Sequence, residues 1–172
     1  MSIRRTLYIV RHAKSTWDIE GISDIDRPLK LRGIRAAYEM SRRLKIERHF
    51  PQKIIASPAN RALHTAVIFH RVFEQKKLTV DIDERLYATG VATIKRLVAQ
   101  QQSDIKRLMI FGHNPDFSEL ATNLTGEGYV ELPTCGLCAI TFEADDWSSI
   151  SAGKMVQFFT DIPKNKELKY LD

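Results

Sequence analysis

Short apolar runs alternate along this sequence with segments of helical periodicity. The runs occupy residues 7–10, 53–56, 78–82 and 108–111. Apolar runs of this length, bounded by polar residues, are typical of strands buried inside a sheet. Apolar residues at helical spacing follow in segments 34–44, 63–73, 94–98 and 117–124. This alternation predicts an α/β fold with a mostly parallel sheet.

Two further strand candidates, 137–142 and 154–159, are separated by a polar loop and predict a terminal antiparallel hairpin at the edge of that sheet. A chain of 172 residues fits within one domain, which we expect to span 1–172. We therefore predict a three-layer α/β/α sandwich, in which helices cover both faces of a mostly parallel central sheet.

The formal net charge is +5, but Lys and Arg are scattered among Asp and Glu. This distribution indicates a solvated basic surface that attracts phosphate-bearing substrates, rather than a nucleic-acid-binding face. The apolar stretch near the N-terminus is too short for a signal peptide or a membrane span. We expect a cytoplasmic protein without a nucleic-acid or membrane partner.

The two cysteines form a C-x-x-C pair, Cys135 and Cys138, which could suggest redox chemistry or half of a zinc site. A structural zinc site needs four ligands and no second Cys pair is present, while a thioredoxin-like motif should open a helix. This pair instead enters a predicted strand. We therefore expect both side chains to serve in packing.

Chemically versatile residues follow three of the predicted strands. Arg11 and His12 come directly after the first run, Ser57 and Arg61 after the second, and His113 after the last. Ligands of open α/β sheets bind at the carboxyl ends of the strands, so we expect these side chains to meet at one edge. Helix starts at two of these positions favour an anion, and the predicted ligand is phosphate or a sulfate-like anion.

Two of these strand exits carry helix-start signals. Ser57 followed by Pro58, and Asn114 followed by Pro115, each place a capping side chain before a proline at the first helical position. The sequence therefore predicts helices that begin at Pro58 and Pro115, with Arg61 on the first turn of its helix.

Five blocks, in order, resemble motifs of the histidine phosphatase superfamily, which includes the phosphoglycerate mutases. They are RHAKSTWD at 11–18, DRPLKLRG at 26–33, SPANRALHT at 57–65, ERLY at 84–87 and GHNP at 112–115. The chain is most similar to the SixA-type phosphohistidine phosphatase branch. Ala13 stands where the superfamily's R-H-G motif has glycine, and Asp18 stands where many relatives carry a phosphate-binding Asn.

The resemblance implies a metal-independent phosphatase without a cofactor. In it, His12 attacks phosphorus and becomes a transient phosphohistidine, while Arg11, Arg61 and His113 bind the equatorial oxygens. The physical reasons are independent of the family. Phosphoryl transfer requires mainly positioning and charge stabilisation, which guanidinium groups can supply, and flanking cations keep an imidazole unprotonated and nucleophilic.

Three further residues complete the candidate site. Glu84 is the candidate proton donor, because it falls where mutase-like relatives carry an acid, although nearby arginines favour its ionised form. Ser15 could donate to phosphate or only turn the loop, and Asp18 is a weaker candidate for substrate binding. Asp26 and Arg27 are expected to tie down the loop by pairing.

The spacing between the blocks bears on the substrate. Small-molecule members of the superfamily commonly carry a lid, but only one helix and one strand fit between Arg61 and Glu84, and again between Glu84 and His113. An open site without a cap favours phosphohistidine in a protein over a small phosphate ester. A small-molecule phosphomonoesterase of the same superfamily and a catalytically silent phosphoprotein-binding domain remain the alternatives.

Overall fold

The computed structural model describes residues 3–151 and 153–165, which contain a six-stranded sheet. The strands are β1 (Arg4–Arg11), β2 (Lys53–Ala56), β3 (Val80–Ile82), β4 (Arg107–Gly112), β5 (Leu137–Glu143) and β6 (Lys154–Asp161), in the order β3-β2-β4-β1-β5-β6. Strands β1 to β4 run parallel to one another, whereas β5 pairs antiparallel with β1 and forms an antiparallel hairpin with β6. The predicted mostly parallel sheet with an antiparallel edge is confirmed.

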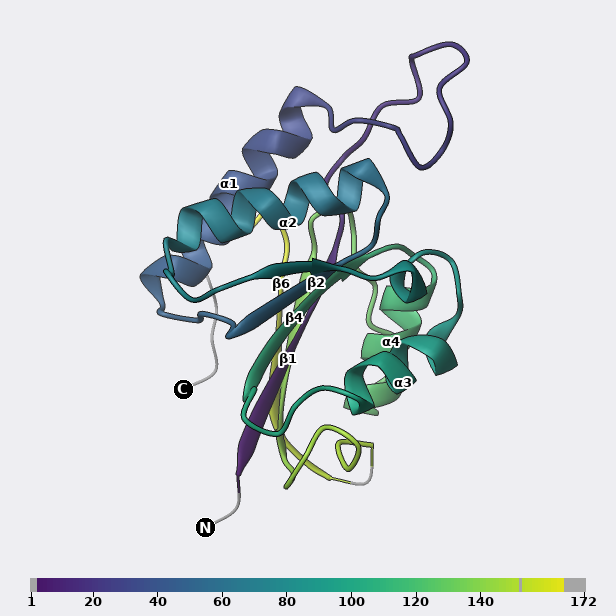
Figure 1. Cartoon of the computed structure of the whole chain (residues 1–172). Coiled ribbons are helices and arrows are strands. Elements are labelled where there is room, and N and C mark those ends of the chain that lie inside the picture. Colours follow the sequence, from purple (N-terminus) through teal and green to yellow (C-terminus); the bar gives the residue numbers. More distant parts are fainter. Residues whose placement is uncertain (1–2, 152, 166–172) are drawn as a thin grey trace.

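Within the described part of the chain, four α-helices cover the two faces of this sheet (Figure 1). They are α1 (Leu31–Ile46), α2 (Asn60–Phe73), α3 (Val91–Ala99) and α4 (Asp116–Thr125), and a short 3-10 helix, η1 (Glu84–Leu86), follows β3. Helices α1 and α2 lie on one face and α3 and α4 on the other, which confirms the three-layer sandwich. Every helix in the described ranges is too short or too polar to cross a lipid bilayer.

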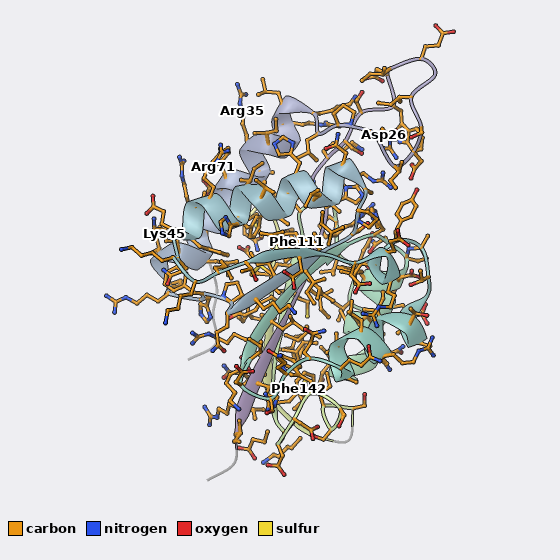
Figure 2. The ribbon with its side chains drawn as sticks, in the orientation of Figure 1. Asp26, Arg35, Lys45, Arg71, Phe111 and Phe142 are labelled. Carbon is orange, nitrogen blue, oxygen red and sulfur yellow. The ribbon has the colours of Figure 1, made fainter. Side chains whose placement is uncertain are left out.

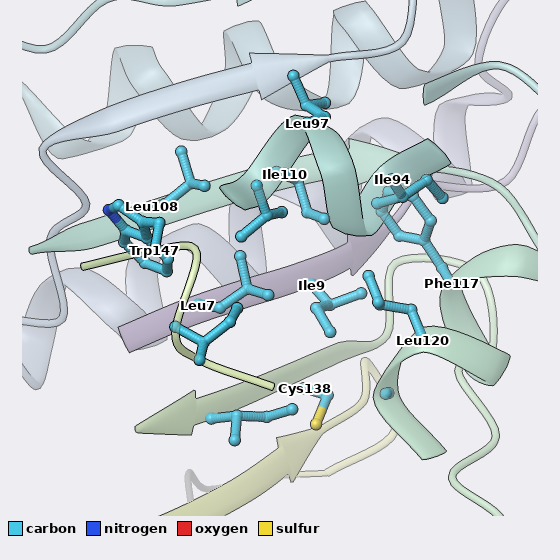
Figure 3. Close-up of a cluster of buried hydrophobic side chains, with 14 of the residues drawn as sticks. Leu7, Ile9, Ile94, Leu97, Leu108, Ile110, Phe117, Leu120, Cys138 and Trp147 are labelled. Atoms are coloured by element: carbon cyan, nitrogen blue, oxygen red, sulfur yellow. The ribbon is translucent and has the colours of Figure 1, made fainter. Parts of the chain in front are cut away.

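Alternate side chains of the central strand β1 supply both cores. Leu7 and Ile9 point toward α3 and α4, where Figure 3 shows them packed with other aliphatic side chains. Tyr8 and Val10 point toward α1 and α2 on the opposite face. Burial of each of the aliphatic side chains Leu7, Ile9 and Val10 stabilises the fold by about 1.5–3 kcal/mol, so β1 is held from both sides. Its carboxyl end is therefore a rigid platform.

The exterior of the helical layer is strongly charged. Figure 2 shows Arg35, Lys45 and Arg71 pointing outward from the layer formed by α1 and α2. Lys45 pairs with Glu74, their charged atoms 2.6 Å apart, in an exposed ion pair of the kind that contributes little to stability. These side chains are exposed to solvent on the outer side of this layer.

Both predicted helix starts are wrong by one or two residues. Helix α2 begins at Asn60, because the Ser57 hydroxyl is hydrogen-bonded to His113 and does not cap the helix. Helix α4 begins at Asp116, with Pro115 as its N-cap residue. The Asn114 side chain still accepts a hydrogen bond from the backbone N–H of Ser118, so it satisfies a helix donor from one position further out.

The two cysteines lie in different cores. Cys135 belongs to the cluster under α1 and α2, and Cys138 to the cluster under α3 and α4. Both are free and buried, and burial raises the pKa of each thiol to about 12. Neutral, enclosed thiols behave as small apolar side chains, in agreement with the packing role predicted for them.

Candidate active site

The carboxyl ends of β1 and β4 bring the two candidate histidines together. These neighbouring parallel strands align Arg11 with Gly112, and the backbone N–H of His12 donates to the Gly112 carbonyl over 3.0 Å. His12 and His113 therefore leave adjacent strands at the same level. Their ring centroids are 5.1 Å apart, so both imidazoles border one small space.

The local structure around His12 leaves one of its ring nitrogens available. Nδ1 lies 2.7 Å from the Ala13 carbonyl oxygen, which can only accept, so Nδ1 carries the proton and Nε2 keeps its lone pair. The His12 carbonyl in turn accepts from the backbone N–H of Cys135. Burial lowers the pKa of His12 to about 4, with Arg61, Arg11 and Arg27 acting in the same direction. The imidazole is thus a neutral nucleophile near neutral pH.

His113 is held in a matching way by Ser57. The Ser57 hydroxyl lies 2.8 Å from Nε2 of His113 and also accepts from the backbone N–H of Ala59. Because the Ser57 oxygen already accepts from Ala59, we assign its proton to the bond with Nε2, and this assignment places the ring proton of the neutral imidazole on Nδ1. Burial, together with the neighbouring His12 and Arg61, lowers the pKa of His113 to about 3.

The two arginines are anchored through their terminal nitrogens. Arg11 donates from Nη1 to the Leu132 carbonyl. Arg61, on the first turn of α2 as predicted, donates from both terminal nitrogens to Asp24. Thr65 links this turn to the His12 loop, because its hydroxyl donates to the Arg61 carbonyl and accepts from the backbone N–H of Ala13.

These anchors leave three buried nitrogens unsatisfied. Among residues 3–151 and 153–165, the buried side-chain nitrogen and oxygen atoms without a hydrogen-bond partner are Arg11 Nε, Arg61 Nε and His113 Nδ1. Buried polar groups are almost always hydrogen-bonded, so a cluster of unpaired donors marks a place for a ligand. All three atoms are donors in the states derived above, and their complement is an oxyanion.

Comparison with known proteins identifies the family. The model of the histidine phosphatase superfamily (branch 1) matches residues 7–97, more than half of the chain. The chain belongs to the histidine phosphatase superfamily. It is 30% identical to a protein of Mycobacterium tuberculosis over 84% of this chain and 93% of the relative. Membership of this superfamily supports phosphatase activity.

Solved structures give the same fold. A protein of Agrobacterium tumefaciens assigned as the phosphohistidine phosphatase SixA superposes with a TM-score of 0.77 and 24% identity, over 90% of this chain and 97% of that one. A protein histidine phosphatase SixA complexed with tungstate superposes with a TM-score of 0.73 and 20% identity, over 92% and 97% of the two chains. This member of the superfamily therefore has the SixA-like, phosphoglycerate mutase-like fold.

The loop that connects β1 to α1 projects beyond the sheet (Figure 1). It contributes the carboxylate of Asp24, which was not predicted from the sequence. Asp24 Oδ2 accepts from Arg61 Nη2 over 2.9 Å and from the Tyr87 hydroxyl over 2.7 Å, while Oδ1 accepts from Arg27. Burial opposes ionisation of Asp24, but these hydrogen bonds outweigh it and hold its pKa well below the ordinary value. Asp24 therefore stays an anion that orients Arg61.

The same loop corrects one predicted pair. Arg27 does tie down the loop, but its ionic partner is Asp24, whereas Asp26 accepts a hydrogen bond from Ser23. Arg27 also donates to the hydroxyl of Ser15, which is buried beside the site. Ser15 retains its own hydroxyl proton, so it can still donate to an anion.

Asp18 and Glu84 lie apart from this arrangement. Asp18 is fully exposed and accepts from Lys30 and from Thr16, without a contact to the two histidines or to Arg61 in the described structure. Glu84 is exposed on η1, and its side chain forms no hydrogen bond or ion pair with another described residue. Tyr87, just after η1, is the residue from this segment that reaches the site, with its ring centroid 5.4 Å from that of His113.

Proposed function

We propose that this chain is a phosphohistidine phosphatase, which removes a phosphoryl group from a histidine of a phosphorylated protein through a covalent intermediate on His12. The main support for this proposal is the set of three buried, unpaired nitrogens on Arg11, Arg61 and His113 beside a neutral His12. Donors fixed in place before the reaction stabilise the charge of a transferring phosphoryl group without reorganisation.

The first half of the reaction transfers the phosphoryl group to His12. Nε2 of His12 attacks phosphorus as the P–N bond of the substrate breaks, and the electron pair of that bond leaves on the substrate imidazole. The other nitrogen of that imidazole carries a proton, so the leaving group departs as a neutral ring. The Arg11, Arg61 and His113 donors bind the equatorial oxygens during this transfer.

The second half regenerates the enzyme. Nδ1 of phospho-His12 stays protonated and donates to the Ala13 carbonyl, so the phosphorylated ring carries a positive charge and is a good leaving group. Water attacks phosphorus, the Nε2–P bond breaks, and the electron pair returns to Nε2. The phosphate leaves with the protons of the water, and His12 is again neutral.

The surroundings of the site favour a P–N substrate over a phosphate ester. Glu84, the predicted proton donor, is exposed and has no contact with either histidine. An alkoxide leaving group requires a proton in the transition state, whereas a protonated phosphoimidazole does not. The segments on either side of Glu84 form α2, β3, α3 and β4, which belong to the sheet and the helices that cover it and do not form a lid. A site without a lid from these segments favours a substrate as large as a protein.

The test is trapping of the intermediate with a phosphohistidine phosphotransfer protein labelled on phosphate, in the presence of a metal chelator. The wild type should acquire acid-labile, base-stable phosphate, and His12→Ala should acquire none. Binding of the phosphoprotein without label transfer would identify a silent binding domain instead. A higher kcat/KM for metabolite phosphates than for the phosphoprotein would identify a small-molecule phosphatase.

A further inference from the structure

A second hollow lies next to the catalytic loop. It has a volume of about 410 Å³ and is lined by the first turns of α1, by residues 133–134 and by residues 162–164. Strand β6 runs parallel to β1, because both are antiparallel to β5, so the segment after Asp161 emerges at the edge where β1 ends. The hollow and the catalytic site therefore share one edge of the sheet.

The charge of the hollow is one-sided. Lys14, Arg32 and Lys164 line it, and no Asp or Glu does. Among the described residues, none of these three side chains forms a hydrogen bond or an ion pair. The first turn of α1, which contributes Arg32, also carries no acidic residue. The positive ends of three side chains are thus left without a counter-charge from the described protein.

The walls are continuous with the catalytic loop. Lys14 follows His12 by two residues, so their α-carbons lie within about 7 Å of each other. The Lys14 carbonyl accepts from the backbone N–H of Lys30, and a side chain on Gly33 would collide with Lys14, so α1 is packed tightly against this loop. Thr134, on the other wall, precedes Cys135, whose backbone N–H binds the His12 carbonyl.

The third wall is fixed by a buried ion pair. Arg43 of α1 donates to both carboxylate oxygens of Asp161 and to the carbonyls of Ile162 and Pro163. The segment that carries Lys164 is thereby held against α1. Ile162 and Pro163 also give the hollow an apolar surface, along which the aliphatic part of a bound side chain can lie.

We propose that this hollow binds acidic side chains of the phosphorylated protein substrate while its phosphohistidine occupies the catalytic site. The inference rests on the proposed function and adds a recognition element to it. A carboxylate on a short aliphatic stem matches both the unpaired cations and the apolar wall, and the volume accommodates one or two such side chains. Charges at the rim of an interface act mainly on encounter and partner choice, so the hollow selects among phosphohistidine proteins.

The experiment compares two double variants with the same loss of charge. The hollow variant, Arg32→Ala/Lys164→Ala, removes two of the cationic side chains that line the hollow. The control variant, Lys76→Ala/Lys77→Ala, removes two exposed lysines from the loop that precedes β3. Each is assayed with a phosphohistidine protein that has acidic residues beside the phosphohistidine, with the same protein after Asp→Asn and Glu→Gln changes there, and with free phosphohistidine. The readout is kcat/KM at low and high ionic strength.

The hollow variant should lower the ratio of kcat/KM for the acidic phosphoprotein to that for free phosphohistidine by about 5- to 10-fold at low salt, and by less at high salt. The control variant should leave this ratio within about 2-fold of the wild type, and the neutralised phosphoprotein should show no difference among the three enzymes. An unchanged ratio in the hollow variant, with a wild type that turns over the phosphoprotein, would overturn this inference alone. A wild type that acts only on small phosphates would overturn the proposed function as well.

Discussion

Replacing Ser57 with alanine should lower kcat/KM by roughly 10- to 100-fold, although Ser57 contacts no substrate atom in the proposed mechanism. Its hydroxyl, fully buried, lies 2.8 Å from Nε2 of His113 and selects the tautomer with the proton on Nδ1. That proton is the one His113 offers to the phosphoryl oxygens. Without Ser57, the proton can move to Nε2, and a lone pair on Nδ1 then faces the anion.

The magnitude follows from the loss of one buried hydrogen bond. A neutral hydrogen bond contributes about 0.5–1.5 kcal/mol, and a buried group left without its partner costs about 1–3 kcal/mol. Burial lowers the pKa of His113 to about 3, so before an anion binds the ring is neutral near neutral pH and only one of its nitrogens carries a proton. A loss of about 1.4–2.8 kcal/mol in the transition state corresponds to the stated range.

Ser41→Ala is the matched control, because Ser41 is equally buried and hydrogen-bonded but lies within α1, where its hydroxyl donates to the Ala37 carbonyl. Both variants should lose about 1 kcal/mol of unfolding free energy in urea, whereas only Ser57→Ala should lose activity toward a small phosphate substrate. Nitrogen NMR should find His113 protonated on Nδ1 in the wild type. The reasoning would be refuted if Ser57→Ala kept the kcat/KM of the wild type, or if His113 of the wild type were protonated on Nε2.

Three other perturbations test the electrostatics of the site. The pKa values of His12 and His113, about 4 and about 3 in the folded state against 6.5 for an ordinary histidine, mean that the unfolded chain takes up protons first as the pH falls. The unfolding free energy should therefore drop by roughly 1–2 kcal/mol per histidine between about pH 7 and about pH 5, and urea titrations should show a smaller drop for His12→Gln. Arg61→Lys should cut kcat/KM by about 100-fold, because lysine cannot bind Asp24 and an anion with one planar group; a loss below about 3-fold would contradict this geometry. Glu84→Gln should reduce kcat/KM for phosphohistidine by less than about 3-fold, and a loss above about 10-fold would make Glu84 the proton donor.

Strand placement was predictable from the sequence because buried strands leave a local signal. The four short apolar runs correspond to β1 to β4. The central strands β1, β2 and β4 are buried on both faces and have to be apolar over most of their length, whereas β3 is a short, partly exposed edge strand. The helix starts were less predictable. Ser57 and Pro58 have the composition of a cap, but the buried imidazole of His113 competes for the same hydroxyl, and that partner is 56 residues away. A local pattern cannot register such competition.

The site was predictable to the extent that strand ends determine it. Arg11 ends β1, and His12 and His113 follow the adjacent parallel strands β1 and β4, so topology alone brings them together. Asp24 was missed because it lies in a long loop whose path depends on tertiary contacts with Arg61 and Tyr87. Its only local signal was the neighbouring Arg27.

The position of Asp24 also explains how the site can be strongly cationic and still select an anion of defined geometry. A guanidinium without a carboxylate partner would bind any anion in several orientations, because its five N–H donors are equivalent in charge. Asp24 accepts one hydrogen bond from each terminal nitrogen of Arg61, and the Leu132 carbonyl accepts one from Nη1 of Arg11, while the Nε–H groups of both arginines stay buried and unpaired. These anchors fix the orientation of each guanidinium, so each arginine presents a buried Nε–H of fixed direction in addition to its charge. The same charges lower the pKa of His12, so one set of cations keeps the nucleophile unprotonated and holds the phosphoryl group that it attacks.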